Sequence, residues 1–340
     1  MNFLQGCIVF LGYIHSFRAL AILFIVAGHS IDFFIWSEQY EALERLLRIL
    51  ISHGASGLFV FIAGYLFQHL AAKYQTKKYF ASKLKNVLLP YFLVSIPAII
   101  IFIFFIHRET VWQGFYDNPQ WLQVVYFYLT GLHLAPFWFI PMMTLFYLMG
   151  PILIRADKNK FFYWILPVAI LISCYFGRGL PYQSFVHFFS VYLLGMFCSH
   201  YKVTVNRILV IPSVLTLLTG VFLFLTVLEF YYVKGTMIFV NYLHKITLCL
   251  FFLGLLIKLG KKLDYKLIRV IADTSFGVFF IHSYVLTGSK MLITKLSGEK
   301  TVGNLLLYPL VVIAVLMSCV GIIVIIQKML GSKSRYLVGS

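Results

Sequence analysis

The chain has 340 residues, of which 61% are hydrophobic, 18% aromatic and only 11% charged, and its mean hydropathy is +0.91. About a quarter of the residues of a soluble domain are charged, so this composition excludes an ordinary soluble protein. The formal net charge is +17. Because the basic residues are scattered over short loops and the aromatic residues lie in apolar runs, a nucleic-acid-binding surface is also excluded.

The predicted elements are ten apolar runs, each close to the ~20 residues that a helix needs to cross a ~30 Å hydrocarbon core. They lie at residues 14–36, 51–71, 86–106, 136–154, 161–177, 183–200, 208–228, 237–258, 268–288 and 303–327. The shorter aromatic stretch 121–134 is typical of a re-entrant or interfacial segment. We therefore predict an all-α integral membrane protein with about ten transmembrane helices in one bundle.

Lysine and arginine gather in the loops on one side of the bilayer, provided that 121–134 does not cross. These loops lie near residues 73–85, 155–160, 202–207, 258–269 and 328–335. Because basic loops remain in the cytoplasm, both termini are expected there. The chain has no internal repeat and no long polar stretch, so residues 1–340 are expected to form one membrane domain without a soluble C-terminal domain.

The first apolar run contains Arg18 and, eleven residues later, His29. On a helix, eleven residues turn by about 1100° and climb about 16 Å, so both side chains lie on one face. A cation and an imidazole inside hydrocarbon each require a polar partner, which favours a functional site. The structural alternative is a snorkelling arginine and a hydrogen-bonded packing histidine.

Four further stretches follow this pair along the chain: 54–67, rich in glycine and phenylalanine; 79–91, with Lys83 and Lys85; 137–141, with Trp138; and 274–282, with Ser275 and His282. In this order, the five stretches resemble the motifs of the membrane acyltransferase 3 family of bacteria. The resemblance departs from the family at Ala63, where a serine is usual. It also departs at Lys83 and Lys85, where two arginines are frequent, so these side chains offer point charges without a bidentate fork.

The resemblance implies a membrane-bound O-acyltransferase. It would transfer an acyl group, most simply acetyl from acetyl-CoA, to a hydroxyl of a cell-surface polysaccharide or its lipid-linked precursor. The implied location is the bacterial cytoplasmic (inner) membrane, and the implied partners are acetyl-CoA, a glycan acceptor and membrane lipid. No metal is expected, since the five cysteines have no paired spacing.

Acyl transfer to a hydroxyl requires a base, a group that stabilises the oxyanion, and positive charge for the phosphates of the donor. His29 is the expected catalytic base, because imidazole titrates near neutrality. Asp32 lies about 60° away around the helix and either orients His29 or is a solvated helix-end carboxylate. The residues expected to bind the donor are Arg18, Lys83 and Lys85, although the two lysines equally fit a solvated loop.

Three residues are expected to line the site on the strength of the resemblance: His282, Ser275 and Trp138. Trp138 also fits the role of an aromatic anchor. The other membrane histidines are interpreted as hydrogen-bonded packing residues: His53, His133, His187 and His244. A buried Lys245 must pair or lose its proton, and the candidate partners are Asp273 and Glu229.

Two other functions fit parts of the pattern. A transporter or polysaccharide-export component also has about ten helices with buried His and Lys, but its halves should be related by a repeat, which the sequence does not show. A catalytically silent scaffold of a polysaccharide-synthesis complex would require His29 to be dispensable.

Overall fold

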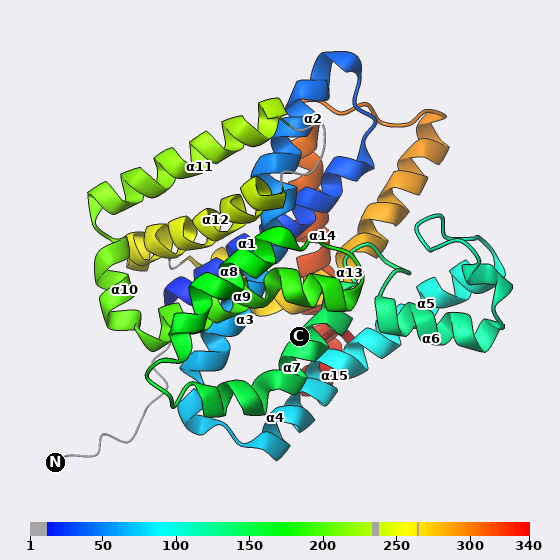
Figure 1. The fold of residues 1–340 in the computed structure, drawn as a ribbon. Coiled ribbons are helices and arrows are strands. Elements are labelled where there is room, and N and C mark those ends of the chain that lie inside the picture. The colour runs from blue at the N-terminus through cyan, green and yellow to red at the C-terminus, as the bar shows by residue number, and fades with distance from the viewer. Residues whose placement is uncertain (1–11, 233–237, 264) are drawn as a thin grey trace.

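The computed structural model describes residues 12–232, 238–263 and 265–340. Over these residues the only β-pairing is an isolated bridge between Ile35 and Val302, so the predicted all-α class is confirmed (Figure 1). The helices are α1 (Gly12–Ser30), α2 (Glu41–Leu47), α3 (His53–His69), α4 (Thr76–Lys83), α5 (Leu89–Phe104), α6 (Gln120–Thr130), α7 (Phe139–Ala156), α8 (Leu166–Tyr175), α9 (Pro181–His200), α10 (Lys202–Leu209), α11 (Pro212–Tyr232), α12 (Ile238–Leu259), α13 (Lys266–Ser297), α14 (Leu307–Leu330) and α15 (Ser334–Val338).

Eight helical segments of the described chain are long and apolar enough to cross a membrane. They coincide with eight of the ten predicted runs and are Gly12–Phe33, Glu38–His69, Thr76–Phe104, Phe139–Ala156, Pro212–Tyr232, Ile238–Leu259, Lys266–Ser297 and Leu307–Val338. Four of them include short turns of different pitch. These are η1 (Ile31–Phe33) after α1, η2 (Glu38–Tyr40) and η3 (Arg48–Ser52) on the two sides of α2, η5 (Leu84–Leu88) between α4 and α5, and η9 (Gly331–Lys333) between α14 and α15. The two remaining runs differ from the prediction.

The predicted run 161–177 forms the shorter apolar helix Phe162–Tyr175. The chain then turns to extended backbone at Phe176, and Gly177, Gly179 and Pro181 follow before α9 begins. The predicted run 183–200 is helical as α9, but it is less apolar than the other spans because it carries serines and histidines. Most of these lie buried inside the protein, where neighbouring helices rather than lipid surround them.

The stretch 121–134 contains α6, which has 11 residues. A helix of that length rises about 16 Å and cannot cross the hydrocarbon core. Helix α6 ends at Gly131, whose φ of 73° is left-handed and therefore favours glycine. Both views show α6 beside α5 at the edge of the molecule. The prediction that this stretch does not span the membrane agrees with its length.

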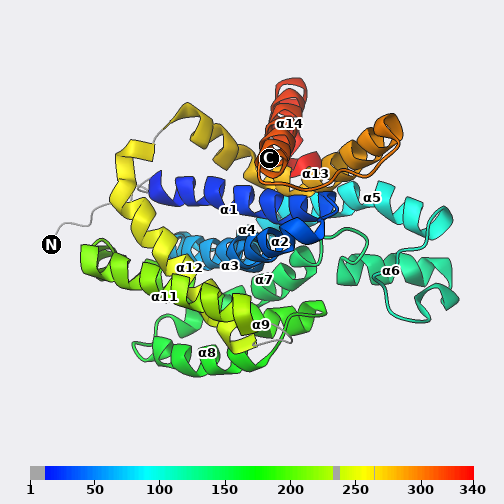
Figure 2. The ribbon, with the colours of Figure 1, turned by 90° about the horizontal axis from the view of Figure 1, so that it is seen from above.

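The helices pack as successive layers around α1 and α3. Helix α1 contacts α13, α14, α3 and α12, while α3 contacts α9, and α9 contacts α8. Figure 2 shows this order, with α13 and α14 on one side of α1 and with α9 and α8 beyond α3. A β-carbon at Gly64 would overlap the backbone of Tyr192, and one at Gly195 would overlap the backbone of Phe61. These two glycines therefore permit the close contact of α3 with α9.

Helix α1 is central in the bundle. Its buried residues Ile14, Phe17, Ile22 and Val26 are at most 2% exposed and point in different directions around the helix. A helix that is apolar all round is surrounded by other helices. The two polar residues of its predicted stripe, Arg18 and His29, therefore meet protein partners instead of lipid.

Candidate active site

Arg18 of helix α1 contacts helix α13. A guanidinium nitrogen of Arg18 donates a hydrogen bond to Ser275 Oγ at 3.1 Å, and the Ser275 hydroxyl donates in turn to the carbonyl of Ala272 at 2.7 Å. Asp273 attracts Arg18 electrostatically, while its carboxylate also faces His15 at 3.5 Å. A guanidinium carries five N–H donors, so most of its hydrogen-bonding capacity remains for a ligand.

His29 of α1 lies beside a second histidine, His282 of α13. The ring centroids of His29 and His282 are 5.2 Å apart. His282 Nδ1 donates to the carbonyls of Val278 and Phe279 at 3.0 and 2.9 Å, so Nδ1 carries the proton and Nε2 is an acceptor. His282 Nε2 is buried and has no hydrogen-bond partner in the described part of the chain. A buried acceptor without a partner is unusual and requires an explanation.

Helices α1 and α13 therefore present two matched polar pairs, Arg18 with Ser275 and His29 with His282. On α1, His29 follows Arg18 by eleven residues. On α13, His282 follows Ser275 by seven residues. The two helices thus run roughly parallel, with the guanidinium at one end of the seam and the imidazoles about 16 Å away along α1. The structure brings four predicted site residues together, and we call this arrangement the α1–α13 seam.

Asp32 lies apart from the seam. Its carboxylate accepts a hydrogen bond from the Arg48 guanidinium at 2.8 Å and is 63% exposed, while its carbonyl accepts one from Lys290 at 2.8 Å. Residue 32 follows the end of α1, in the turn η1, where the helical direction changes. The structure shows Asp32 in an exposed ion pair and does not bring its carboxylate to His29.

The two predicted donor-binding lysines have different environments. The Lys83 ammonium lies 4.7 Å from the ring centroid of Tyr147 and 5.3 Å from that of Tyr79, so two aromatic faces hold the charge. Lys85 is exposed. Tyr79 and its neighbour Tyr74 have buried hydroxyls with no partner among the described residues. Lys83 thus lies between two aromatic rings, whereas Lys85 is an exposed residue of the helical turn η5.

Residues 334–340 connect the lysine segment to the α1–α13 seam. Helix α15 contacts both η5, which contains Lys85, and α13. Ser340 Oγ accepts a hydrogen bond from the amide of Gly277 at 2.7 Å, two residues beyond Ser275. Figure 1 shows α15 beside α5 and α7. The predicted donor-binding residues of α1 and of η5 are therefore linked through one short segment.

Trp138 precedes α7 and contacts an arginine of the loop between α8 and α9, which is not among the predicted site residues. The Arg178 guanidinium lies 4.5 Å from the ring centroid of Trp138 and 5.9 Å from that of Phe188. Arg178 also interacts electrostatically with His29. The Arg178 side chain is charged at neutral pH. One face of Trp138 is thus occupied, and Trp138 positions a cation near the seam.

A local signal for Arg178 exists in the sequence. It is flanked by Gly177 and Gly179 in a short loop that precedes the proline at the start of α9. Flanking glycines allow a loop to turn sharply. Such a loop can place a single charged side chain back over the protein, but only the fold shows that this side chain lies over Trp138.

Lys245 belongs to a second polar cluster, which joins α3, α9, α11 and α12. Its ammonium is 1% exposed and contacts His187 Nε2 at 3.2 Å and Asn241 Oδ1. Asn241 donates to Glu229 Oε1 at 2.7 Å, and the same oxygen is 2.6 Å from His53 Nδ1. Of its two candidate partners, Lys245 therefore reaches Glu229 through Asn241, while Asp273 belongs to the α1–α13 seam. We call this cluster the Lys245 network.

The histidines interpreted as packing residues all have hydrogen-bond partners. His187 Nδ1 donates to the carbonyl of Phe176 at 2.6 Å. His244 Nε2 contacts Thr226 at 3.1 Å, and His133 Nε2 contacts Ser95 at 2.8 Å. No group of three or more His, Cys, Asp or Glu in the described ranges could hold a metal ion.

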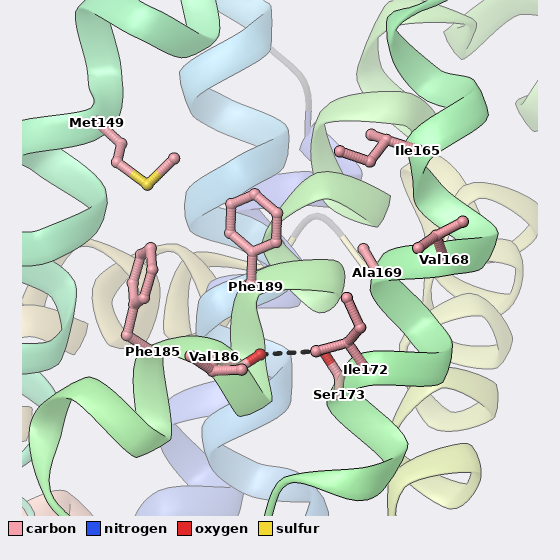
Figure 3. A pocket seen from close by; sticks show the side chains of 9 residues that line it. All are labelled: Met149, Ile165, Val168, Ala169, Ile172, Ser173, Phe185, Val186 and Phe189. Atoms are coloured by element: carbon pink, nitrogen blue, oxygen red, sulfur yellow. Dashed lines mark hydrogen bonds between the residues drawn. The ribbon is translucent and has the colours of Figure 1, made fainter.

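Two cavities lie away from the α1–α13 seam. One, of about 230 Å³, is apolar and lies between α7, α8 and α9. Figure 3 shows Met149 and Phe185 facing Ile165 and Val168 across it, and the hydroxyl of Ser173 donating to the carbonyl of Val186. The other, of about 290 Å³, is polar and is lined by Glu41, Glu44, Arg45, Arg48, Ile49 and His53. Neither is lined by a predicted site residue.

Comparison with known proteins gives one match, to a family model described as an acyltransferase domain, over residues 11–326. No curated protein and no solved structure matches the chain. The family match covers all five sequence stretches and both helices of the seam. The chain therefore belongs to the acyltransferase 3 family.

Proposed function

We propose that the protein transfers acetyl from acetyl-CoA to a hydroxyl of a bacterial surface polysaccharide or its lipid-linked precursor, in the cytoplasmic membrane. One observation carries this proposal: the two polar pairs of the α1–α13 seam, Arg18 with Ser275 and His29 with His282. Arg18 binds an anionic group of the donor. The long flexible arm of acetyl-CoA then extends along α1 and places the thioester at His29.

His29 acts as the general base in this proposal. The acceptor hydroxyl attacks the thioester carbonyl while His29 takes its proton, so that a C–O bond forms and an oxyanion develops. When the oxyanion collapses, the C–S bond breaks and the imidazolium returns the proton to the CoA thiolate. His282 Nε2 is the free acceptor beside this ring. It positions His29 by accepting its second N–H as the two rings approach.

Lys83 extends the donor site in this proposal. Its ammonium is fixed by Tyr79 and Tyr147, and residues 334–340 connect its segment with α13. A phosphate of the donor would contact Lys83 as a point charge, with Arg18 supplying the planar fork. Lys85 is exposed and contributes attraction over a longer range.

The direct test is acetyl transfer by the purified protein. Radiolabelled acetyl-CoA is incubated with the protein and a panel of lipid-linked and free glycans, and we expect label to appear in the glycan with release of one CoA per acetyl group. Calorimetry measures acetyl-CoA binding in parallel. A protein that moves the glycan across vesicle membranes and binds no acetyl-CoA would instead be a transporter or export component.

The proposed orientation places both termini and the lysine segments in the cytoplasm. Residues 1–11 lie outside the described chain, so the test uses internal positions. Single cysteines replace Ser82, Lys262, Gln113 and Thr301 in a cysteine-free background. An impermeant maleimide on intact spheroplasts should label only Gln113→Cys and Thr301→Cys. Labelling of Lys262→Cys would show that this residue faces the outside and would contradict the proposed orientation of the C-terminal half.

A further inference from the structure

Arg178 is a cation near the imidazole end of the seam with no counter-ion among the described residues. Its guanidinium rests on the ring of Trp138, 4.5 Å from the centroid, and the side chain is exposed to solvent. No hydrogen bond or ion pair to Arg178 occurs in the part of the chain that the structure describes. The planar face of the guanidinium is held by the aromatic ring, so its N–H edge remains for a ligand.

A second cation, Lys245, lies near the same aromatic ring as Arg178. The guanidinium of Arg178 and the ammonium of Lys245 are each 5.9 Å from the centroid of the same ring, Phe188. Lys245 is fully enclosed, and the carboxylate that compensates it, Glu229, is reached through Asn241. Glu229 is thus linked to Lys245, and no carboxylate is linked to Arg178 among the described residues. A guanidinium that lies over aromatic rings retains its N–H donors for a charge-assisted hydrogen bond to an anion.

The location of Arg178 decides which substrate would supply that anion. The ring centroid of Trp138 lies 6.1 Å from that of Phe139. Phe139 lies 5.6 Å from Phe279, which lies 6.3 Å from His282. This series of rings places Arg178 toward the imidazole end of the seam, where its charge also acts on His29. In acetyl-CoA, the phosphates and the acetyl group are at opposite ends of the molecule. With acetyl at His29, the phosphates lie far away toward Arg18. An anion at Arg178 must therefore come from the acceptor.

We propose that Arg178, held by Trp138 and backed by Lys245, forms an anion-binding subsite for the acceptor, so that the acceptor carries a carboxylate or phosphate close to the hydroxyl that is acetylated. This inference rests on the proposed function. The guanidinium fork contacts two oxygens of the anion at once, which fixes the distance from the charged group to the hydroxyl facing His29. The subsite thereby selects the acidic sugar, or the phosphate-linked sugar of a lipid carrier, over a neutral one.

The test measures binding of defined probes to the full-length protein in detergent. Three ligands are titrated: methyl glucuronide, methyl glucoside and a farnesyl phosphate-linked glucose. The protein variants are wild type, Arg178→Gln, Arg178→Lys and Arg45→Gln. Arg45 is the matched control, because it also lies over an aromatic ring, 5.8 Å from the centroid of Phe230, but donates to the carbonyl of that residue.

We expect the wild type to bind the glucuronide or the phosphate-linked probe at least about tenfold more tightly than the glucoside. Arg178→Gln should abolish this preference, Arg178→Lys should retain part of it, and Arg45→Gln should retain all of it. The tighter of the two charged probes identifies the anion as a sugar carboxylate or a carrier phosphate. Unchanged acetyl-CoA binding by Arg178→Gln shows that the variant is folded.

Two results would overturn the subsite: a wild type that binds charged and neutral probes equally, or an Arg178→Gln variant that keeps the preference for the anion. The proposed function has a separate readout in the same samples. If the wild type binds acetyl-CoA and acetylates a glycan while showing no anion preference, the function stands and the subsite fails. If acetyl-CoA does not bind, the proposed function fails, whatever the probes show.

Discussion

The α1–α13 seam and the Lys245 network both bury titratable side chains among apolar helices, but they differ in how these side chains are paired. In the network, Lys245, Asn241 and Glu229 are joined in series by hydrogen bonds, and His53 and His187 complete the two ends. In the seam, His282 Nε2 has no partner among the described residues, and Arg18 makes one side-chain hydrogen bond, to Ser275.

This difference separates structural from chemical roles. A buried polar group without a partner destabilises the fold by about 1–3 kcal/mol, and such groups persist mostly where they serve a ligand or a reaction. The network gives each of its side chains at least one hydrogen-bond partner, although Glu229 Oε2 has none among the described residues, and so it ties α9, α11 and α12 together. The seam leaves donors and acceptors open at two points about 16 Å apart, which the proposed function assigns to the phosphates of the donor and to proton transfer.

The substitution His29→Ala is expected to have the largest effect and tests the chemical role of the seam. Removal of a general base should lower acetyl transfer by ~10² to 10⁴ and leave the amount of protein in the membrane unchanged. Transfer is measured at equal protein amounts, and His107→Ala serves as the control because that exposed histidine stacks on Tyr116 outside the seam. A His29→Ala variant with more than a tenth of wild-type turnover would remove His29 as the base.

The corresponding change in the network is Lys245→Met, and it should act on stability. Removing one member of a buried charged cluster leaves Asn241, His187 and Glu229 uncompensated, which costs about 3–5 kcal/mol. The expected result is a large drop in the thermal unfolding temperature in detergent. Lys77→Met, at an exposed position of α4, should unfold like the wild type. If Lys245→Met were as stable as that control, the network would not hold the helices together.

Arg18 tests the donor end of the seam. Arg18→Ala should weaken acetyl-CoA binding by ~1.5–3 kcal/mol, the value of a hydrogen bond to a charged group. Arg18→Lys keeps the charge without the planar fork and should lose less. His29→Ala should bind acetyl-CoA nearly as well as the wild type. Calorimetry on the three proteins decides the point, and equal affinities for wild type and Arg18→Ala would exclude Arg18 from the donor site.

The smallest effect is expected for His282→Phe, which keeps a ring of similar size but removes Nε2. Loss of one hydrogen bond to His29 corresponds to ~0.5–1.5 kcal/mol, or about a two- to tenfold fall in kcat. The KM for acetyl-CoA should not change, and the pH profile of kcat should shift because His29 loses its positioning partner. A structural role for His282 would lower stability and leave the pH profile in place.

The sequence by itself determined the helical class, because long apolar runs admit no other fold in a membrane. It also determined the stripe of Arg18 and His29, since residues of one helix have a fixed angular spacing. Ser275 and His282 were reached only through resemblance to a family, because periodicity within one helix carries no information about which other helix will face it.

Tertiary structure decided the remaining features. Asp32 follows the last turn of α1, so its direction depends on the chain after the helix, and Arg48 holds it there. Helix α9 carries so many polar residues that it is not among the eight segments apolar enough to cross a membrane. The packing around it buries most of these residues. Arg178 reaches the neighbourhood of His29 only because Trp138, 40 positions earlier in the sequence, supports its guanidinium. Contacts between distant segments arise from packing of whole helices, which local spacing does not encode.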